Sequence, residues 1–193
     1  MDLTPETIDL GPLALEILRP PSADELIDEE RFDHDDYMPY WAELWPSGVE
    51  LACAVARREL DGLRVLELGC GLGLPSLAAA ARGARVLATD WAEDAIALLR
   101  RNAARNELEL EAALVPWSDP ASLVAAAPWD LVLGADLLYE PRNVDALLDL
   151  LPLLGSDVLL TEPGRPTAGR FFERAAQRWE IVRDGRVYEL HTR

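Results

Sequence analysis

Hydrophobic and polar residues follow two rhythms along the chain, and each rhythm predicts one type of element. Short apolar runs, some alternating with polar residues, predict strands over residues 64–68, 84–89, 108–115, 129–133 and 157–161. Apolar residues at helical spacing predict helices over residues 48–60, 74–82, 92–106, 143–151 and 167–178. This alternation of strands and helices predicts an α/β fold, with a doubly wound parallel sheet covered by helices on both faces.

The start of the chain departs from this alternation. Leu13, Leu15 and Ile17 alternate with other residues and the run ends at two prolines, which predicts one short strand within residues 8–18. The acidic residues 22–38 predict a loop.

The end of the chain predicts a hairpin. Asp184-Gly185 lies between two strand-like runs, and this dipeptide is a strong signal for a tight antiparallel turn. We therefore expect an acidic N-terminal extension with a short strand over residues 1–47. The main domain is expected over residues 48–193, with an antiparallel hairpin at the edge of its sheet.

The charge of the chain is strongly acidic. It has 35 acidic residues against 18 arginines and no lysine, for a formal net charge of −17. This balance argues against a generic binder of nucleic acids or anionic membranes, whose affinity comes from clustered positive charge. The first 36 residues hold 12 of the acids and two of the arginines. Such a run is usually a solvated face, and the alternative is a surface that steers a basic partner toward the protein.

Several other classes of protein are disfavoured. No apolar run is long enough to predict a transmembrane helix, and the first residues lack the basic start and apolar core of a signal peptide. The two cysteines, Cys53 and Cys70, make neither a disulfide framework nor a zinc site, and no metal site is expected. We expect a cytoplasmic monomer with no nucleic-acid or membrane partner.

A glycine-rich loop follows the strand predicted at 64–68 and opens the next helix. Its glycines, Gly69, Gly71 and Gly73, follow a G-x-G-x-G spacing, whereas a dinucleotide loop would need its third glycine at the position of Leu74. Glu67 ends the strand beside the loop, where a carboxylate would repel a pyrophosphate but could receive an ammonium group. The loop therefore departs from the dinucleotide pattern, and a nicotinamide enzyme remains the alternative.

The next strand ends in a second candidate for ligand binding. Asp90 could accept hydrogen bonds from both hydroxyls of a ribose, and Trp91 could lie against an adenine. The loop, Glu67 and Asp90 in this strand–helix context together resemble motif I of the class I S-adenosylmethionine-dependent methyltransferases.

Four further stretches resemble one group of that class, the seven-strand protein lysine methyltransferases. Asp136-Leu-Leu-Tyr139 is similar to their D-x-x-Y motif, and the Asn-Pro-Pro-Tyr type of motif found in nucleic-acid enzymes is missing. Trp41 to Gly48 is similar to a W-x-x-x-W-P-x-G stretch of the group, and Trp117 follows the third strand of the domain, where the group often has a tryptophan. Glu162-Pro-Gly-Arg-Pro is similar to the D-P-G-R-P of the electron-transfer flavoprotein β-subunit lysine methyltransferases and their bacterial relatives, with glutamate in place of aspartate.

This resemblance implies a Rossmann-like, seven-stranded sheet and the cofactor S-adenosyl-L-methionine, with S-adenosyl-L-homocysteine as product. Together with the loop and strand residues named above, the predicted cofactor-binding residues are Trp45, Glu67, Gly69, Cys70, Gly71, Gly73, Asp90, Trp91, Trp117 and Ala135. Asp136 and Tyr139 are predicted to shape the channel for the acceptor amine. Core packing is the alternative for Trp45 and Trp117, and a helix-capping surface position is the alternative for Tyr139. Cys70 is expected to be a small loop residue, because neither histidine is near it in sequence.

The expected activity is methyl transfer to the side-chain amine of a lysine in a protein. Such an amine must lose its proton before it can attack, and Asp136 would oppose that loss if it were charged and close. We therefore predict that Asp136 positions the acceptor and does not act as a general base. A small-molecule N-methyltransferase and a non-catalytic cofactor-binding module are the alternatives. The expected partner is a protein with an accessible lysine, or a small amine.

Overall fold

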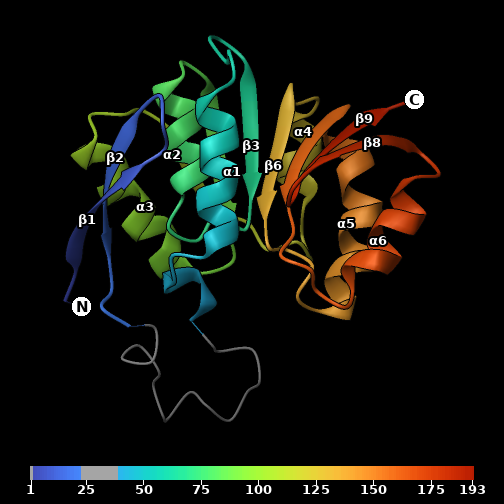
Figure 1. The fold of residues 1–193 in the computed structure, drawn as a ribbon, viewed down its shortest axis with the longest axis horizontal. Coiled ribbons are helices and arrows are strands. Elements are labelled where there is room, and N and C mark those ends of the chain that lie inside the picture. Colours follow the sequence, from blue (N-terminus) through green and yellow to red (C-terminus); the bar gives the residue numbers. More distant parts are fainter. Residues whose placement is uncertain (1, 23–38) are drawn as a thin grey trace.

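The computed structural model describes residues 2–22 and 39–193, and these form a mixed seven-stranded sheet beside a small two-stranded one (Figure 1). The large sheet has the strand order β5-β4-β3-β6-β7-β9-β8. Its first five strands pair in parallel, whereas β9 and β8 are antiparallel. Its strands are β3 (Arg64–Leu68), β4 (Arg85–Asp90), β5 (Glu111–Leu114), β6 (Leu131–Ala135), β7 (Asp157–Thr161), β8 (Trp179–Asp184) and β9 (Val187–Thr192). The predicted Rossmann-like sheet with a C-terminal antiparallel hairpin is confirmed.

Helices cover both faces of this sheet, as the pattern predicted (Figure 1). Neighbouring residues of β3 separate the two cores, because Val65 packs in the hydrophobic cluster beneath the first three helices and Leu66 packs in the cluster beneath the last three. The first group is α1 (Pro46–Ala56), α2 (Leu74–Ala81) and α3 (Glu93–Arg105). The second group is α4 (Ala121–Ala126), α5 (Pro141–Leu154) and α6 (Ala168–Ala175).

The prediction of a single strand within residues 8–18 is wrong. The chain forms two antiparallel strands, β1 (Thr4–Asp9) and β2 (Ala14–Arg19), with Ile8 opposite Leu15. The chain reverses because Gly11 adopts a φ of +90° and its backbone N–H donates to Oδ1 of Asp9 at 2.8 Å. A Gly-Pro pair between two strand-like runs was the available turn signal.

Asn102 of α3 and Asn106, the C-cap of that helix, bind the edge of β2 that faces away from β1. Asn102 accepts a hydrogen bond from the backbone N–H of Leu18 at 2.7 Å and donates to the carbonyl of the same residue at 3.2 Å. Asn106 makes the same two contacts with Glu16, at 2.9 and 2.7 Å. The side-chain amides therefore replace a neighbouring strand and fix the hairpin to the main domain.

We expect Asn102→Ala to lower the free energy of unfolding by about 1–3 kcal/mol, because it leaves two partly buried backbone groups of Leu18 without their side-chain partner. Asn102 is fully buried and Asn106 is only partly buried, so Asn106→Ala should cost less. Urea unfolding of both variants measures the two costs. Equal and small effects would show that the hairpin does not depend on these amides.

The other boundaries differ from prediction in small ways. The strand β5, predicted over 108–115, covers only Glu111–Leu114. Leu114 was expected on the apolar face of this strand but is 52% exposed. The helix α4 was not predicted, and β6 begins at Leu131 and not at Trp129. The turn between β8 and β9 falls one residue later than predicted, at Gly185-Arg186. In the described ranges, no helix is both long and apolar enough to span a membrane.

The acidic loop predicted over 22–38 lies almost wholly outside the described residues, and so do residues 23–36 of the acidic run for which a steering surface was the alternative. The division of the chain at residue 47 remains a prediction. The helix α1 begins at Pro46, one residue before that boundary.

Candidate active site

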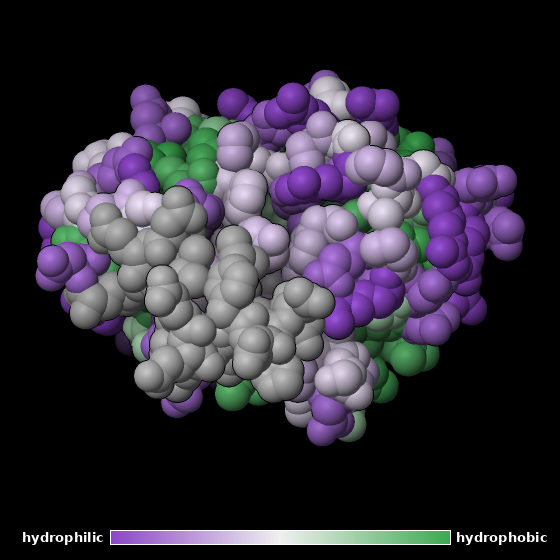
Figure 2. All heavy atoms as spheres, turned by 90° about the horizontal axis from the view of Figure 1, so that it is seen from below, coloured by the Kyte–Doolittle hydropathy of each residue, from purple (hydrophilic) through white to green (hydrophobic). Residues whose placement is uncertain are grey.

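The predicted site residues gather at the carboxyl ends of the parallel strands. In Figure 1 the arrowheads of β3 and β6 point to this edge, and the first turn of α1 lies at the same edge. Figure 2 views the molecule from this side, where most of the described surface is hydrophilic to neutral and hydrophobic residues form separate patches. Ligands of doubly wound sheets bind at this edge.

The glycine loop after β3 leaves no room for side chains. Gly69, Gly71 and Gly73 all have positive φ, at 61°, 50° and 75°. A Cβ on Gly73 would lie 2.2 Å from Cδ1 of Leu99 in α3, and one on Gly69 would lie 2.9 Å from Cδ2 of Leu137. Glycine is therefore required at these two positions by backbone conformation and by packing.

A short helical turn, η2 (Tyr40–Ala42), lies against the same loop. A Cβ on Gly71 would be 3.1 Å from the carbonyl oxygen of Trp41. The indole of Trp117 lies on another side of the loop, with Cζ2 at 3.5 Å from where a Cβ of Gly69 would be. The loop is thus a bare backbone cradle between two tryptophan-bearing segments.

Asp90 supports this cradle from the end of β4. Its Oδ2 accepts the backbone N–H of Gly71 at 2.9 Å, and its Oδ1 accepts that of Ala92 at 3.0 Å. The carboxylate is almost fully buried, and burial raises its pKa. Each oxygen keeps a lone pair for a further donor, so both hydroxyls of a ribose could bind here.

Glu67 is buried beneath the loop at the end of β3. Its Oε2 accepts hydrogen bonds from both the backbone N–H, at 2.9 Å, and the hydroxyl of Ser76 in α2. Burial raises the pKa of Glu67 to about 8, and the nearby Asp90 acts in the same direction. Glu67 is therefore mostly protonated at pH 7, and the ammonium contact predicted from the sequence would require this proton to leave.

The raised pKa of Glu67 predicts a pH-dependent stability. Between the ordinary glutamate pKa of 4.5 and the folded value of about 8, the unfolded chain loses a proton that the folded protein keeps. The stabilisation is therefore complete at low pH and is lost as the pH rises through about 8. Relative to Glu67→Gln, the wild-type free energy of unfolding should fall by on the order of 3 kcal/mol from pH 5 to pH 8.

Urea unfolding of both proteins across this pH range tests the prediction. All other acids are shared, so they largely cancel in the difference. Glutamine can still accept both Ser76 hydrogen bonds, which makes it a close replacement. Parallel stability curves would mean that Glu67 is already ionised in the folded protein.

The remaining predicted cofactor residues lie around the cradle. Cys70 is buried within the loop, its backbone N–H donates to the carbonyl of Thr89 at 2.9 Å, and burial raises the pKa of its thiol. It therefore fits the predicted role of a small loop residue. Trp91 is 47% exposed directly after β4, and Ala135 ends β6 beside β3.

Asp136 forms a two-point ion pair that the sequence did not reveal. Its Oδ1 accepts Nε of Arg165 at 2.9 Å and its Oδ2 accepts an Nη of the same guanidinium at 2.6 Å. Asp136 adopts a φ of +52°, in the left-handed region, and its backbone N–H donates to Thr161 at 2.9 Å. The loops after β6 and β7 are therefore locked together at the edge of the sheet.

Tyr139 lies in a group of exposed aromatic rings. Its ring centroid is 5.9 Å from that of Tyr40, and the centroid of Tyr40 is 6.3 Å from that of Trp45. Trp45 is 37% exposed, so it is not a fully buried core residue, and its ring contact is with Tyr40. Whether Trp45 also encloses an adenine with Trp117 remains a prediction.

Comparison with known proteins decides the family. A family model described as lysine methyltransferase matches residues 38–177, a span that includes the glycine loop, Asp90, Asp136 and Arg165. The chain belongs to this lysine methyltransferase family. Its cofactor is S-adenosyl-L-methionine, as predicted.

The names of curated relatives of this chain give two types of acceptor, lysine and arginine. The chain is 35% identical over 134 residues to the zebrafish (Danio rerio) electron transfer flavoprotein beta subunit lysine methyltransferase, covering 66% of this chain and 51% of that protein. It is 34% identical over 122 residues to the zebrafish protein N-lysine methyltransferase METTL21A, covering 60% and 56%. It is 30% identical over 134 residues to the mouse (Mus musculus) histone-arginine methyltransferase METTL23, covering 66% and 53%. The chain therefore spans about half the length of the curated relatives it matches.

Solved structures agree on the fold. One is the Thermus thermophilus 16S rRNA N2 G1207 methyltransferase in complex with S-adenosylmethionine and guanosine. The superposition covers 99% of this chain and 51% of that one, with a TM-score of 0.72 at 15% identity. The Synechocystis magnesium protoporphyrin IX methyltransferase with bound cofactor superposes on 85% and 89%, with a TM-score of 0.64 at 18% identity. Both show the fold of methyltransferases that bind this cofactor.

The residues of this chain fit the cofactor. The positive φ and close packing of Gly69 and Gly73 keep the loop backbone free of side chains beside Asp90. Asp90 lies beside it with both carboxylate oxygens anchored by backbone N–H groups, so its orientation is fixed before a ribose binds. The individual contacts of the predicted cofactor residues remain predictions.

Three residues of the candidate site escaped the sequence analysis. Tyr40 directly precedes one recognised motif and Arg165 stands inside another, but nothing in the spacing indicated an aromatic contact or an ion pair. Ser76, the partner of Glu67, sits in the first turn of α2, where a serine is unremarkable. A signal for Arg165 existed in principle, since a buried aspartate requires a cationic or hydrogen-bonding partner.

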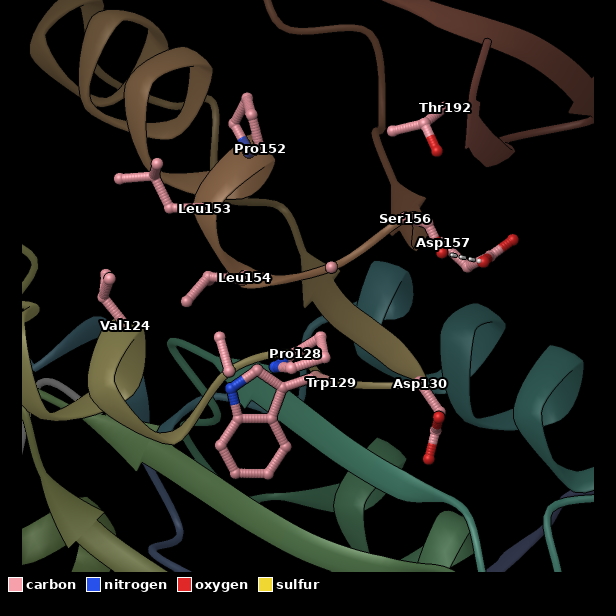
Figure 3. Close-up of a pocket in the computed structure, with 12 residues that line it drawn as sticks. Val124, Pro128, Trp129, Asp130, Pro152, Leu153, Leu154, Ser156, Asp157 and Thr192 are labelled. Carbon is pink, nitrogen blue, oxygen red and sulfur yellow. Dashed lines mark hydrogen bonds between the residues drawn. The ribbon is translucent and has the colours of Figure 1, made fainter.

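An open hollow of about 740 Å³ lies at the opposite edge of the sheet and is distinct from this site (Figure 3). It is lined by the segments that precede β6 and β7, with the Trp129 ring against Leu154 and Val124. Its two acids already have partners: Asp130 accepts the backbone N–H of Arg64, and Asp157 binds Ser156. None of the predicted site residues lines it.

Proposed function

We propose that this methyltransferase transfers a methyl group to the side-chain amine of a lysine in another protein. The observation that supports this most is the lysine methyltransferase family match, which spans the predicted site residues from Trp45 to Asp136 and Tyr139. Two curated relatives have protein lysine as the acceptor in their names. Since this chain spans about half of their length, the acceptor is a proposal.

The chemistry requires a neutral amine beside the cofactor. S-adenosyl-L-methionine supplies an electrophilic methyl group on a sulfonium, and S-adenosyl-L-homocysteine is the product. A lysine side chain has a reference pKa of ~10.4, so the site must favour loss of its proton. Desolvation at the edge of the sheet acts in this direction.

The Asp136–Arg165 pair removes an obstacle to this deprotonation. A lone carboxylate near the amine would hold it as an ammonium. Because both oxygens of Asp136 are bound to the guanidinium of Arg165, the pair carries no net charge. We propose that Asp136 positions the acceptor, as the sequence predicted, and takes no proton from the amine. Tyr139 is proposed to line the same channel.

The overall charge is also consistent with a lysine-bearing partner. A net charge of −17 favours encounter with basic acceptors, and the protein offers no lysine side chain of its own. A small amine is the alternative acceptor.

Labelling of a cell lysate tests the proposal. The full chain is incubated with lysate and S-adenosylmethionine tritiated on the methyl group, beside an Asp90→Ala control. The expected result is protease-sensitive label that depends on Asp90 and elutes with methyllysine after acid hydrolysis. Label in methylarginine would contradict the lysine proposal and favour arginine, the acceptor named for the METTL23 relatives. Label in the small-molecule filtrate would support a small amine as acceptor. A lack of Asp90-dependent label would favour a non-catalytic binding module.

A further inference from the structure

Three aromatic rings are exposed together at the acceptor end of the site. Tyr40 is 48% exposed, Tyr139 40% and Trp45 37%. All three are among the exposed large hydrophobic side chains of the described residues, and a contiguous group of three at a ligand-binding edge is a candidate binding surface. The rings come from η2, from the N-cap of α1 and from the loop after β6.

Tyr40 is tilted against both of the other rings and stacks on neither of them. The Tyr40 plane is tilted by 55° to that of Trp45 and by 59° to that of Tyr139. Rings at such angles expose faces as well as edges to the space beside them. The indole N–H of Trp45 donates to the carbonyl oxygen of Tyr40 at 2.8 Å, which fixes the orientation of one ring.

Two buried acids lie in the loops after β6 and β7 at this edge of the sheet. They are Asp136, whose two oxygens bind the guanidinium of Arg165, and Glu162. Glu162 Oε1 accepts the backbone N–H groups of Gly164 and Arg165, whereas its buried Oε2 has no hydrogen-bond partner within the described residues. The hydrogen bond and charge of Asp136 raise the pKa of Arg165, and Glu162 and Tyr40 add smaller effects in the same direction. Tyr139, three residues after Asp136, joins this region to the rings.

We propose that Tyr40, Trp45 and Tyr139 form an aromatic cage that binds the methylated ammonium group of the acceptor side chain. This rests on the proposed function for the nature of the acceptor. A carboxylate binds an ammonium through N–H donors, which disappear as methyl groups replace hydrogens. Aromatic faces attract the positive charge itself and do not need those donors. The cage therefore selects alkylated ammonium groups over neutral groups of the same shape.

The test uses two ligands that differ only in charge. Nε-trimethyllysine and its neutral isostere, with a tert-butyl group in place of trimethylammonium, are titrated into the full chain loaded with S-adenosylhomocysteine. The readout is the indole N–H signal of Trp45 in ¹⁵N–¹H spectra, assigned by its loss in Trp45→Phe. We expect saturable shifts and an affinity about 5- to 30-fold higher for trimethyllysine, the ratio that cation–π attraction supplies.

Substitutions of the aromatic residues test which rings bind the charged ligand. Tyr40→Leu and Tyr139→Leu should reduce this preference to about twofold or less, while Tyr40→Phe should retain it, since the ring face is kept. Tyr188→Leu is the matched control, because Tyr188 stacks on Phe172 away from the site at 4.0 Å and its loss should leave the preference unchanged. Melting curves confirm that each variant is folded.

Two results would overturn the cage: equal affinity for the charged and neutral ligands in the wild type, or no saturable shift of the Trp45 signal with either. Both are read from the unmodified protein and do not depend on a variant folding. Binding is measured without methyl transfer, so the two proposals fail separately. Charge-dependent binding with no labelled protein would leave the cage and remove the lysine proposal, and labelled methyllysine with no preference for charge would do the reverse.

Discussion

Asp90→Ala is expected to weaken the binding of S-adenosylhomocysteine by at least about 100-fold. The substitution removes the two charge-assisted hydrogen bonds that a ribose would make, each of about 1.5–3 kcal/mol. It also frees the backbone N–H groups of Gly71 and Ala92, which Asp90 now holds in place. Calorimetric titration of the full chain measures the loss.

Two control variants separate the causes. Asp90→Asn keeps one acceptor oxygen and should lose an intermediate amount of affinity, about tenfold. Asp94→Ala removes an exposed acid from the first turn of α3, four residues away, and should bind as the wild type does. An Asp90→Ala protein with unchanged affinity would contradict the placement of the ribose at the end of β4.

Arg165→Ala is expected to lower the rate of methyl transfer by about 10- to 100-fold while changing S-adenosylhomocysteine affinity by less than about threefold. The guanidinium joins the loop after β7 to the loop after β6 through both oxygens of Asp136. Without it the acceptor channel shifts, and a displacement of about 1 Å in a reacting group can cost ~10²-fold in rate. Labelling of lysate protein gives the rate, and calorimetry gives the affinity.

The chain offers a matched control for this ion pair. Arg170 also binds both oxygens of an aspartate, Asp145, at 2.9 Å, but that pair is about half exposed on the surface of α5 and α6. Exposed pairs contribute little, so Arg170→Ala should leave both rate and affinity unchanged. Arg165→Lys keeps the charge without the two-point geometry and should fall between the two. A fully active Arg165→Ala protein would show that the loops hold their positions without the pair.

The strands of the main sheet were the most predictable part of the fold. The strands at 64–68 and 157–161 have the predicted bounds, because four of the five residues in each are buried, most of these are apolar, and each strand starts at a polar residue. The third strand was less predictable, since β5 is an edge of the sheet and Leu114 faces solvent there. The hairpin at the start of the chain was not predicted from local pattern. Its strand β2 is held by β1 and by the side chains of Asn102 and Asn106, which are distant in the chain.

The sequence alone determined the fold class, because hydrophobic periodicity and strand ends are properties of neighbouring residues. The family and the cofactor followed from the resemblance of the glycine loop, Asp90 and the later motifs to those of known methyltransferases. Tertiary structure alone decided the ionisation of Glu67, the pairing of Asp136 with Arg165 and the contact of Tyr40 with Trp45 and Tyr139. A pKa depends on burial and a charge pair depends on proximity, and both arise only when strand ends that are distant in sequence meet at one edge of the sheet.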